Sequence, residues 1–153
     1  MPAIRVNGEP REVAASDGAT LLDVLRNQLG LMGTRYGCGL EQCGCCMVLV
    51  DGEAVYSCTR EVGTVAGKSV TTVEGLGSID KPHPIQQAFL DEQAGQCGYC
   101  LSGIIMSTKA LLDRNPKPSR ADIVAALDKH LCRCGAHQRI IRAVARAAER
   151  LAK

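Results

Sequence analysis

The cysteine spacing is the feature that most limits how this chain can fold. In the first half of the chain, four cysteines follow the spacing C-x4-C-x2-C-x11-C: Cys38, Cys43, Cys46 and Cys58. Three of these thiols come from a single loop, which must therefore wrap closely around whatever it binds. Gly37, Gly39 and Gly44 lie between or beside the cysteines and give the loop the backbone freedom that such a wrap requires.

This spacing is typical of the ligands of a plant-type 2Fe–2S cluster. A structural zinc site is the alternative, but such sites usually combine two short knuckles rather than one wrapped loop. The ninth cysteine, Cys45, is adjacent to Cys46. Two neighbouring side chains do not easily face the same metal, so we expect Cys45 to be a small buried thiol.

The second half of the chain contains a different set of cysteines, in which C-x2-C and C-x-C are separated by 31 residues: Cys97, Cys100, Cys132 and Cys134. Each pair comes just before a predicted helix, so two helix N-termini with unpaired N–H groups would face the same centre. This arrangement suits an anionic iron–sulfur cluster. A four-cysteine zinc site also fits C-x2-C, and the spacing alone leaves it open.

The pattern around the cysteines predicts an α+β protein with two domains, residues 1–76 and 77–153. In the first domain, Asn7-Gly8 and Asp51-Gly52 are typical of hairpin turns, and Thr20 is a suitable helix N-cap. The expected β-grasp arrangement has one helix after Thr20 and strands near 3–7, 11–13, 47–50, 54–56 and 69–73.

The second domain is predicted to be a small four-helix bundle that follows a Gly- and Pro-containing linker at about 75–84. Its helices are expected to begin near Pro84, to run from Leu101 to Arg114, to follow the cap Ser119, and to begin near His137. Only 3% of the residues are aromatic, so two small aliphatic cores need reinforcement, which metal centres can supply.

Charge and composition exclude several functional classes. The 18 basic and 16 acidic residues are too balanced to indicate nucleic-acid binding, and no apolar run approaches the length of a membrane span. The N-terminal residues lack the pattern of a secretory signal, and an odd cysteine count argues against a disulfide scaffold. We therefore expect a cytoplasmic protein, with export to the periplasm beside a signal-bearing partner as the alternative.

Three segments together resemble a known family. Gly37-Cys-Gly-Leu-Glu-Gln-Cys-Gly-Cys-Cys, Gln96-Cys-Gly-Tyr-Cys and Leu131-Cys-Arg-Cys-Gly occur in order, and the resemblance covers essentially the whole chain. They resemble the small iron–sulfur subunit of the molybdenum hydroxylases, the xanthine oxidase and aldehyde oxidoreductase family. The Glu-Gln-Cys form is most similar to the iron–sulfur subunits of aldehyde dehydrogenases and to the alpha subunit of isoquinoline 1-oxidoreductase.

The resemblance implies a plant-ferredoxin-like domain and a four-helix domain, each with one 2Fe–2S cluster held by its four cysteines. It implies a large partner subunit that binds molybdopterin, in the cytosine dinucleotide form, and oxidises an aldehyde or N-heteroaromatic substrate. Electrons would pass through the C-terminal cluster and then the N-terminal cluster to an external acceptor, such as a cytochrome c or a flavin subunit. Gln96 and Cys134 would face the pterin.

The sequence lacks the residue patterns that catalysis or dinucleotide binding by this chain alone would require. It shows no arrangement of residues for nucleophilic or acid–base catalysis and no dinucleotide-binding glycine pattern, so we expect no turnover and no FAD on this chain. A free two-cluster ferredoxin and a zinc-stabilised binding module are the alternative functions.

We expect His83 to be an exposed linker residue and His130 to be a cation in the last turn of a helix. A row of four arginines in the last helix indicates either a solvated or a docking face: Arg139, Arg142, Arg146 and Arg150.

Overall fold

The N-terminal half is built on a mixed five-stranded sheet. The computed structural model describes residues 2–153 and gives the strand order β2-β1-β5-β3-β4. β5 pairs in parallel with β1 and antiparallel with β3, which joins the two hairpins into one sheet. The strands are β1 (Ala3–Val6), β2 (Glu9–Glu12), β3 (Met47–Val50), β4 (Glu53–Tyr56) and β5 (Ser69–Thr71).

Both hairpin turns have the backbone that their sequences predict. Asn7 and Gly8 have φ angles of 51° and 87°, and Asp51 and Gly52 have φ angles of 49° and 84°. Two successive positive φ angles are typical of a type I′ turn, whose twist matches that of the flanking strands. The turns therefore fix the register of both hairpins, in which Val6 faces Glu9 and Val50 faces Glu53.

One face of the sheet is covered by a short helical segment. This segment comprises α1 (Leu21–Asp23) and continues as a π-helical turn, η1 (Val24–Gln28). The Thr20 hydroxyl caps its N-terminus by accepting a hydrogen bond of 3.2 Å from the Asp23 N–H. The apolar side chains between helix and sheet are fully buried and include Leu21, Leu25, Val48 and Val70.

The C-terminal half contains the four predicted helices: α2 (Pro84–Asp91), α3 (Leu101–Arg114), α4 (Arg120–Leu127) and α5 (His137–Leu151). Ser119 and Asp122 form a reciprocal capping box at the start of α4, as predicted. The core between the helices is aliphatic apart from Phe89 and includes Ile85, Ile104, Leu111, Ile140 and Val144.

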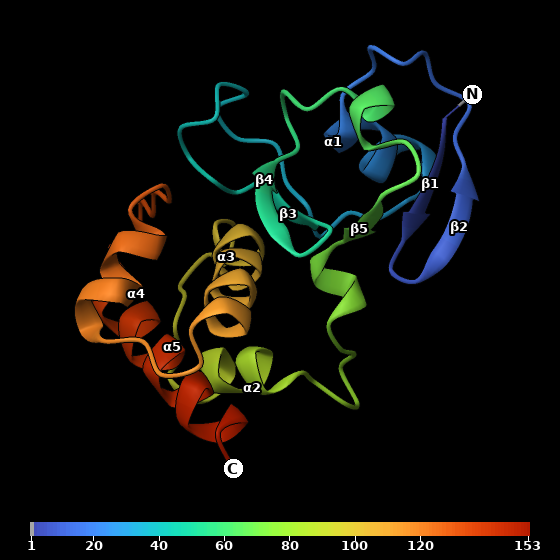
Figure 1. The fold of residues 1–153 in the computed structure, drawn as a ribbon. Helices are drawn as coiled ribbons and strands as arrows, with labels where there is room; N and C mark the ends of the chain where they lie inside the picture. The colour runs from blue at the N-terminus through green and yellow to red at the C-terminus, as the bar shows by residue number, and fades with distance from the viewer. Residues whose placement is uncertain (1) are drawn as a thin grey trace.

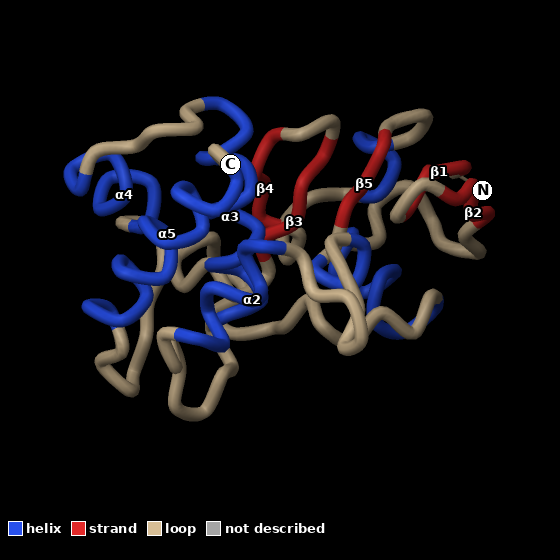
Figure 2. Tube along the Cα trace, turned by 90° about the horizontal axis from the view of Figure 1, so that it is seen from below, coloured by secondary structure: helices blue, strands red, loops and turns tan. Residues whose placement is uncertain are grey.

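The two halves pack directly on each other through β3 and α3. Residues in a strand alternate between the two faces, so Val48 and Val50 face α1 while Met47 and Leu49 face the opposite side. There Met47 and Leu49 contact Met106 and Ala110 of α3. Figures 1 and 2 show α3 between the sheet and the remaining helices. β3 is consequently buried on both faces.

The structure corrects the expectation that His83 is an exposed linker residue. His83 is half-buried and caps α2, because its Nδ1 accepts a hydrogen bond of 3.1 Å from the Ile85 N–H. Burial, with a smaller effect of Lys109, lowers its pKa. On α5, three members of the arginine row form ion pairs with Asp91 and Glu92 at the end of α2 while remaining at least one-third exposed: Arg142, Arg146 and Arg150.

No helix within residues 2–153 is both long and apolar enough to cross a membrane.

Candidate metal centres

The four cysteines of the first group come together as two pairs. The loop before β3 places Cys38 beside Cys43, where each backbone N–H donates to the other's sulfur over 3.4 Å. The β3–β4 register, with Met47 opposite Tyr56, brings the residues just outside the hairpin together. Cys46 and Cys58 interact there. The 11 residues between Cys46 and Cys58 therefore span one two-stranded hairpin, formed by β3 and β4.

Backbone N–H groups converge on the sulfur of Cys38. Those of Leu40 and Gln42 donate over 3.3 Å, and that of Cys43 over 3.4 Å. Positive φ angles at Gly39 and Glu41, 70° and 57°, turn the chain so that these groups point inward. Burial raises the pKa of the Cys38 thiol, but the N–H donors outweigh this effect and lower the pKa to about 7. The loop is therefore built to hold a thiolate.

Cys45 lies behind this pair as a protonated thiol. It is buried, as predicted, and its Sγ lies 3.4 Å from that of Cys43 and donates to the Arg35 carbonyl over 3.3 Å. Burial raises the pKa of Cys45 to about 12. A Cβ atom at Gly37 would lie 2.7 Å from both the Cys43 and the Cys45 sulfur, so only glycine fits at this position.

The second group also forms two pairs. The side chains of Cys97 and Cys134 interact, as do those of Cys100 and Cys132. Burial raises the pKa of Cys132, but N–H groups of Ala136 and its neighbours, at the start of α5, outweigh this effect and lower it. Burial, with Cys132 nearby, raises the pKa of Cys100 to about 12. α3 begins directly after Cys100, so both helix N-termini lie where the sequence predicts.

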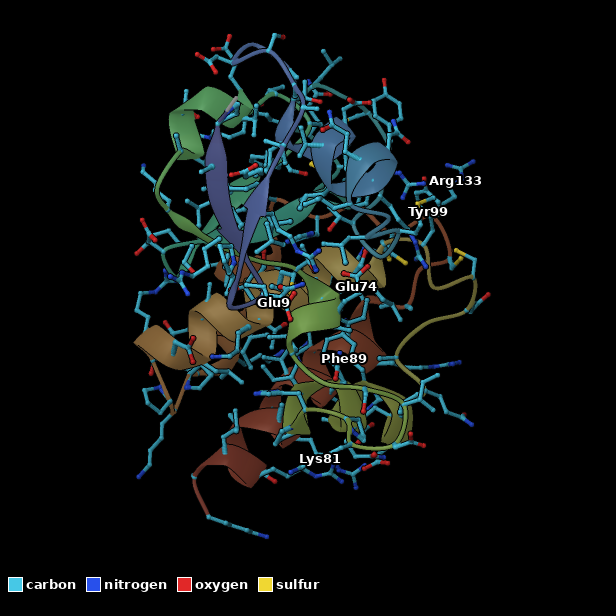
Figure 3. The ribbon with its side chains drawn as sticks, turned by 90° about the vertical axis from the view of Figure 1, so that its right-hand side faces the viewer. Glu9, Glu74, Lys81, Phe89, Tyr99 and Arg133 are labelled. Carbon is cyan, nitrogen blue, oxygen red and sulfur yellow. The ribbon has the colours of Figure 1, made fainter. Side chains whose placement is uncertain are left out.

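The two cysteine loops meet at one cavity. The Leu131 N–H donates to the Cys43 carbonyl over 3.0 Å, which joins the second loop to the first. Tyr99 and Arg133 lie at this edge of the molecule in Figure 3, beside several sulfur atoms. The cavity has a volume of about 230 Å³ and is lined by members of both cysteine groups: Cys38, Cys43, Cys97, Cys100 and Cys132, with Cys45, Gly37, Tyr99, Leu131 and Arg133.

Sequence reasoning missed the packing that holds these loops together. His130 is buried, its Nε2 lies 2.6 Å from the Ser107 Oγ, and burial lowers its pKa to about 4. It is therefore a neutral core residue and not the helix-end cation that we expected. Gly44 and Gly103 bring the loop into direct backbone contact with α3. Glycine within a helical pattern was the available signal for this contact.

Gln96 and Cys134, the two residues expected to face a pterin, lie beside each other. The Gln96 side-chain amide donates to the Cys134 carbonyl over 3.3 Å. Gln96 is exposed and Cys134 is partly exposed. The Gln96 side-chain carbonyl can therefore still accept a hydrogen bond from another molecule.

The arrangement fits a binuclear cluster. Each iron of a 2Fe–2S cluster is bound by two thiolates, and both groups supply two thiol pairs with N–H donors around them. Within residues 2–153, no three His, Cys, Asp or Glu side chains are grouped as ligands of a single ion. The pairing thus matches the ligand pattern of two 2Fe–2S clusters.

Comparisons with known proteins agree with this chemistry. Residues 4–71 match the 2Fe–2S iron–sulfur cluster binding domain family, and residues 72–145 match the [2Fe–2S] binding domain family. The chain is 56% identical to one subunit of the nicotinate dehydrogenase of Pseudomonas putida, over 96% of this chain and 94% of that one. It is 51% identical to the alpha subunit of isoquinoline 1-oxidoreductase from Brevundimonas diminuta, over 96% and 97%.

A solved structure has the same fold. The aldehyde oxidoreductase from Desulfovibrio desulfuricans matches with a TM-score of 0.95 and 44% identity. The match covers 99% of this chain but only 17% of the other, so in that protein this fold is one part of a much longer chain.

Proposed function

This chain belongs to the 2Fe–2S subunits of the molybdenum hydroxylases, and we propose that its eight paired cysteines hold the two clusters of an electron-transfer subunit. Cys38, Cys43, Cys46 and Cys58 hold the N-terminal cluster, and Cys97, Cys100, Cys132 and Cys134 hold the C-terminal cluster. When bound, each cluster accepts and releases one electron at a time.

The observation that carries this proposal is the pairing of thiols beneath inward-pointing N–H groups. At Cys38, Cys97 and Cys132 these groups lower the pKa of the thiol and so stabilise the thiolate, which is the form that binds iron. The turns at Gly39 and Glu41 and the N-terminus of α5 orient these donors toward the sulfur atoms. The chain thus contributes the ligands, the N–H donors around them and a site partly shielded from water.

We propose further that the partner is a large molybdopterin-binding subunit, with the cofactor in the cytosine dinucleotide form. The relatives named above act on nicotinate and isoquinoline, which favours an N-heteroaromatic substrate for the complex; the name of the solved aldehyde oxidoreductase supports an aldehyde as the alternative. The acceptor is external, a cytochrome c or a flavin subunit, and no FAD binds this chain. Nine free cysteines favour cluster loading in the reducing cytoplasm.

We place the pterin beside Gln96 and Cys134. Both lie at the surface next to the C-terminal pairs, and a heterocycle rich in donors and acceptors needs polar partners when it is buried. The C-terminal cluster is then the first to receive electrons.

Purification of the tagged chain from its native host tests the function. We expect a co-purifying molybdenum-containing subunit, and anaerobic addition of its substrate should reduce both clusters. Recovery of an iron-loaded chain without any such partner would favour the free ferredoxin. A colourless, zinc-loaded chain would favour the binding module.

A further inference from the structure

Arg35 belongs to the N-terminal domain but reaches into the second cysteine loop. Its guanidinium Nη1 donates to the Gly98 carbonyl over 2.6 Å and to the Tyr99 carbonyl over 3.1 Å. The guanidinium also lies 5.2 Å from the centre of the Tyr99 ring, within range of a cation–π interaction. These carbonyls belong to the two residues between Cys97 and Cys100.

The backbone of Arg35 is fixed equally firmly to the first loop. Its N–H donates to the Cys45 carbonyl over 3.3 Å, and its carbonyl accepts the Cys45 thiol over 3.3 Å. The Tyr99 hydroxyl in turn donates to the Tyr36 carbonyl. One half-buried residue is thus bound at its backbone to the first loop and at its side chain to the second.

The position of this cation has an electrostatic consequence. The cavity beside Tyr99 is lined by ligands of both groups, and each loaded site is anionic and gains one negative charge on reduction. A guanidinium held on carbonyl oxygens in a partly water-excluded site is screened less than an exposed one. It therefore favours the more negative, reduced state of both sites.

We propose that Arg35 is a positioning residue that locks the two cluster loops at a fixed separation and raises both reduction potentials. This inference rests on the proposed function in requiring two clusters, but it needs no partner protein. The role divides into charge and geometry, because the cation acts on the potentials while the carbonyl and ring contacts act on the spacing of the loops. The two parts can be separated by substitution.

The test uses the whole cluster-loaded chain and electron paramagnetic resonance (EPR). Arg35→Met keeps the aliphatic length but removes the charge and both hydrogen bonds, whereas Arg35→Lys keeps the charge but loses the planar group above Tyr99. Arg11→Met is the matched control, because Arg11 is an exposed cation of β2 that forms an ion pair with Glu9. A redox titration gives both potentials, and the magnetic splitting between the two reduced clusters reports their relative position.

We expect Arg35→Met to lower the equilibrium constant for one-electron reduction about tenfold at each cluster, a shift of about 59 mV, and to alter the splitting. Arg35→Lys should leave the potentials close to wild type while still altering the splitting, and Arg11→Met should change neither. Loss of the C-terminal signal alone in Arg35→Met also supports the lock, because Arg35 supplies no ligand to that cluster. Wild-type potentials and splitting in Arg35→Met would overturn it. A wild-type chain without two signals would instead refute the proposed function.

Discussion

Gly103→Ala tests the direct contact between α3 and the first cysteine loop. A Cβ atom at Gly103 would lie 2.0 Å from the carbonyl oxygen of Gly44 and 2.9 Å from the Cα of Cys45. Both are backbone atoms, so no change of rotamer can relieve the clash. The loop must move, and it carries Cys43 and Cys46.

The expected magnitude follows from two opposing effects. Alanine is a better helix former than glycine and would stabilise α3 by up to about 1 kcal/mol. Overpacking usually costs about 1–3 kcal/mol, and a backbone contact of this kind lies at the upper end. We expect a net loss of about 2–3 kcal/mol, which lowers the melting temperature of a chain of this size by about 4–12 °C.

Anaerobic melting of the cluster-loaded chain, followed by circular dichroism, measures this loss. EPR should also show an altered N-terminal signal, because its ligand loop is displaced. Gly18→Ala is the matched control: nothing lies within 4 Å of the added Cβ and φ is not positive, so its expected effect is a gain of about 0.4–1 kcal/mol. A melting temperature that rises in Gly103→Ala as in the control would refute the contact.

Cys45, Gln96 and His83 each allow a further test of the structure. Cys45→Ala should leave both clusters intact while Cys46→Ala abolishes the N-terminal EPR signal; the reverse pattern would mean that the ligand assignment is out of register. In the reconstituted complex, Gln96→Leu should weaken the pterin contact by about 1–3 kcal/mol. The loss would be seen as slower reduction of the C-terminal cluster by substrate or as lower pterin content. The control Gln87→Leu on α2 should change neither the reduction rate nor the pterin content. Because burial lowers the pKa of His83, its N-cap is intact above about pH 6.5 and is lost as the pH falls through the lowered pKa of the folded state. The Ile85 amide should therefore become less protected against hydrogen exchange in acid. His83→Asn keeps a capping side chain that does not titrate, so this variant should lose the pH dependence. Equal pH dependence in the wild type and in His83→Asn would contradict the prediction.

Local chemistry made much of the fold predictable. The turns at Asn7-Gly8 and Asp51-Gly52 need positive φ at both positions, which the sequence shows directly. α3 ends before Asn115-Pro116, as predicted, because proline disfavours helical backbone in the preceding residue. The cysteine spacing predicted two sets of four thiols, whereas the pairing within the first set follows from the structure, in which the longest interval spans the β3–β4 hairpin.

Contacts between distant segments could not be predicted in this way. Arg35 and Gly98 are 63 residues apart, and nothing in either local pattern indicates that they meet. The burial of His130 depends on α3 and on the first loop together, so its position near a helix end suggested the wrong charge state. The sequence predicted residues 47–50 only as a hairpin strand, and the structure shows that α3 covers the second face of β3.

Metal analysis with EPR on the purified chain tests the central claim most directly. Two complete sets of four cysteines predict about four iron and four acid-labile sulfide per chain, with two distinct rhombic signals after reduction. A single signal, or zinc at a stoichiometric level in place of iron, would contradict the account.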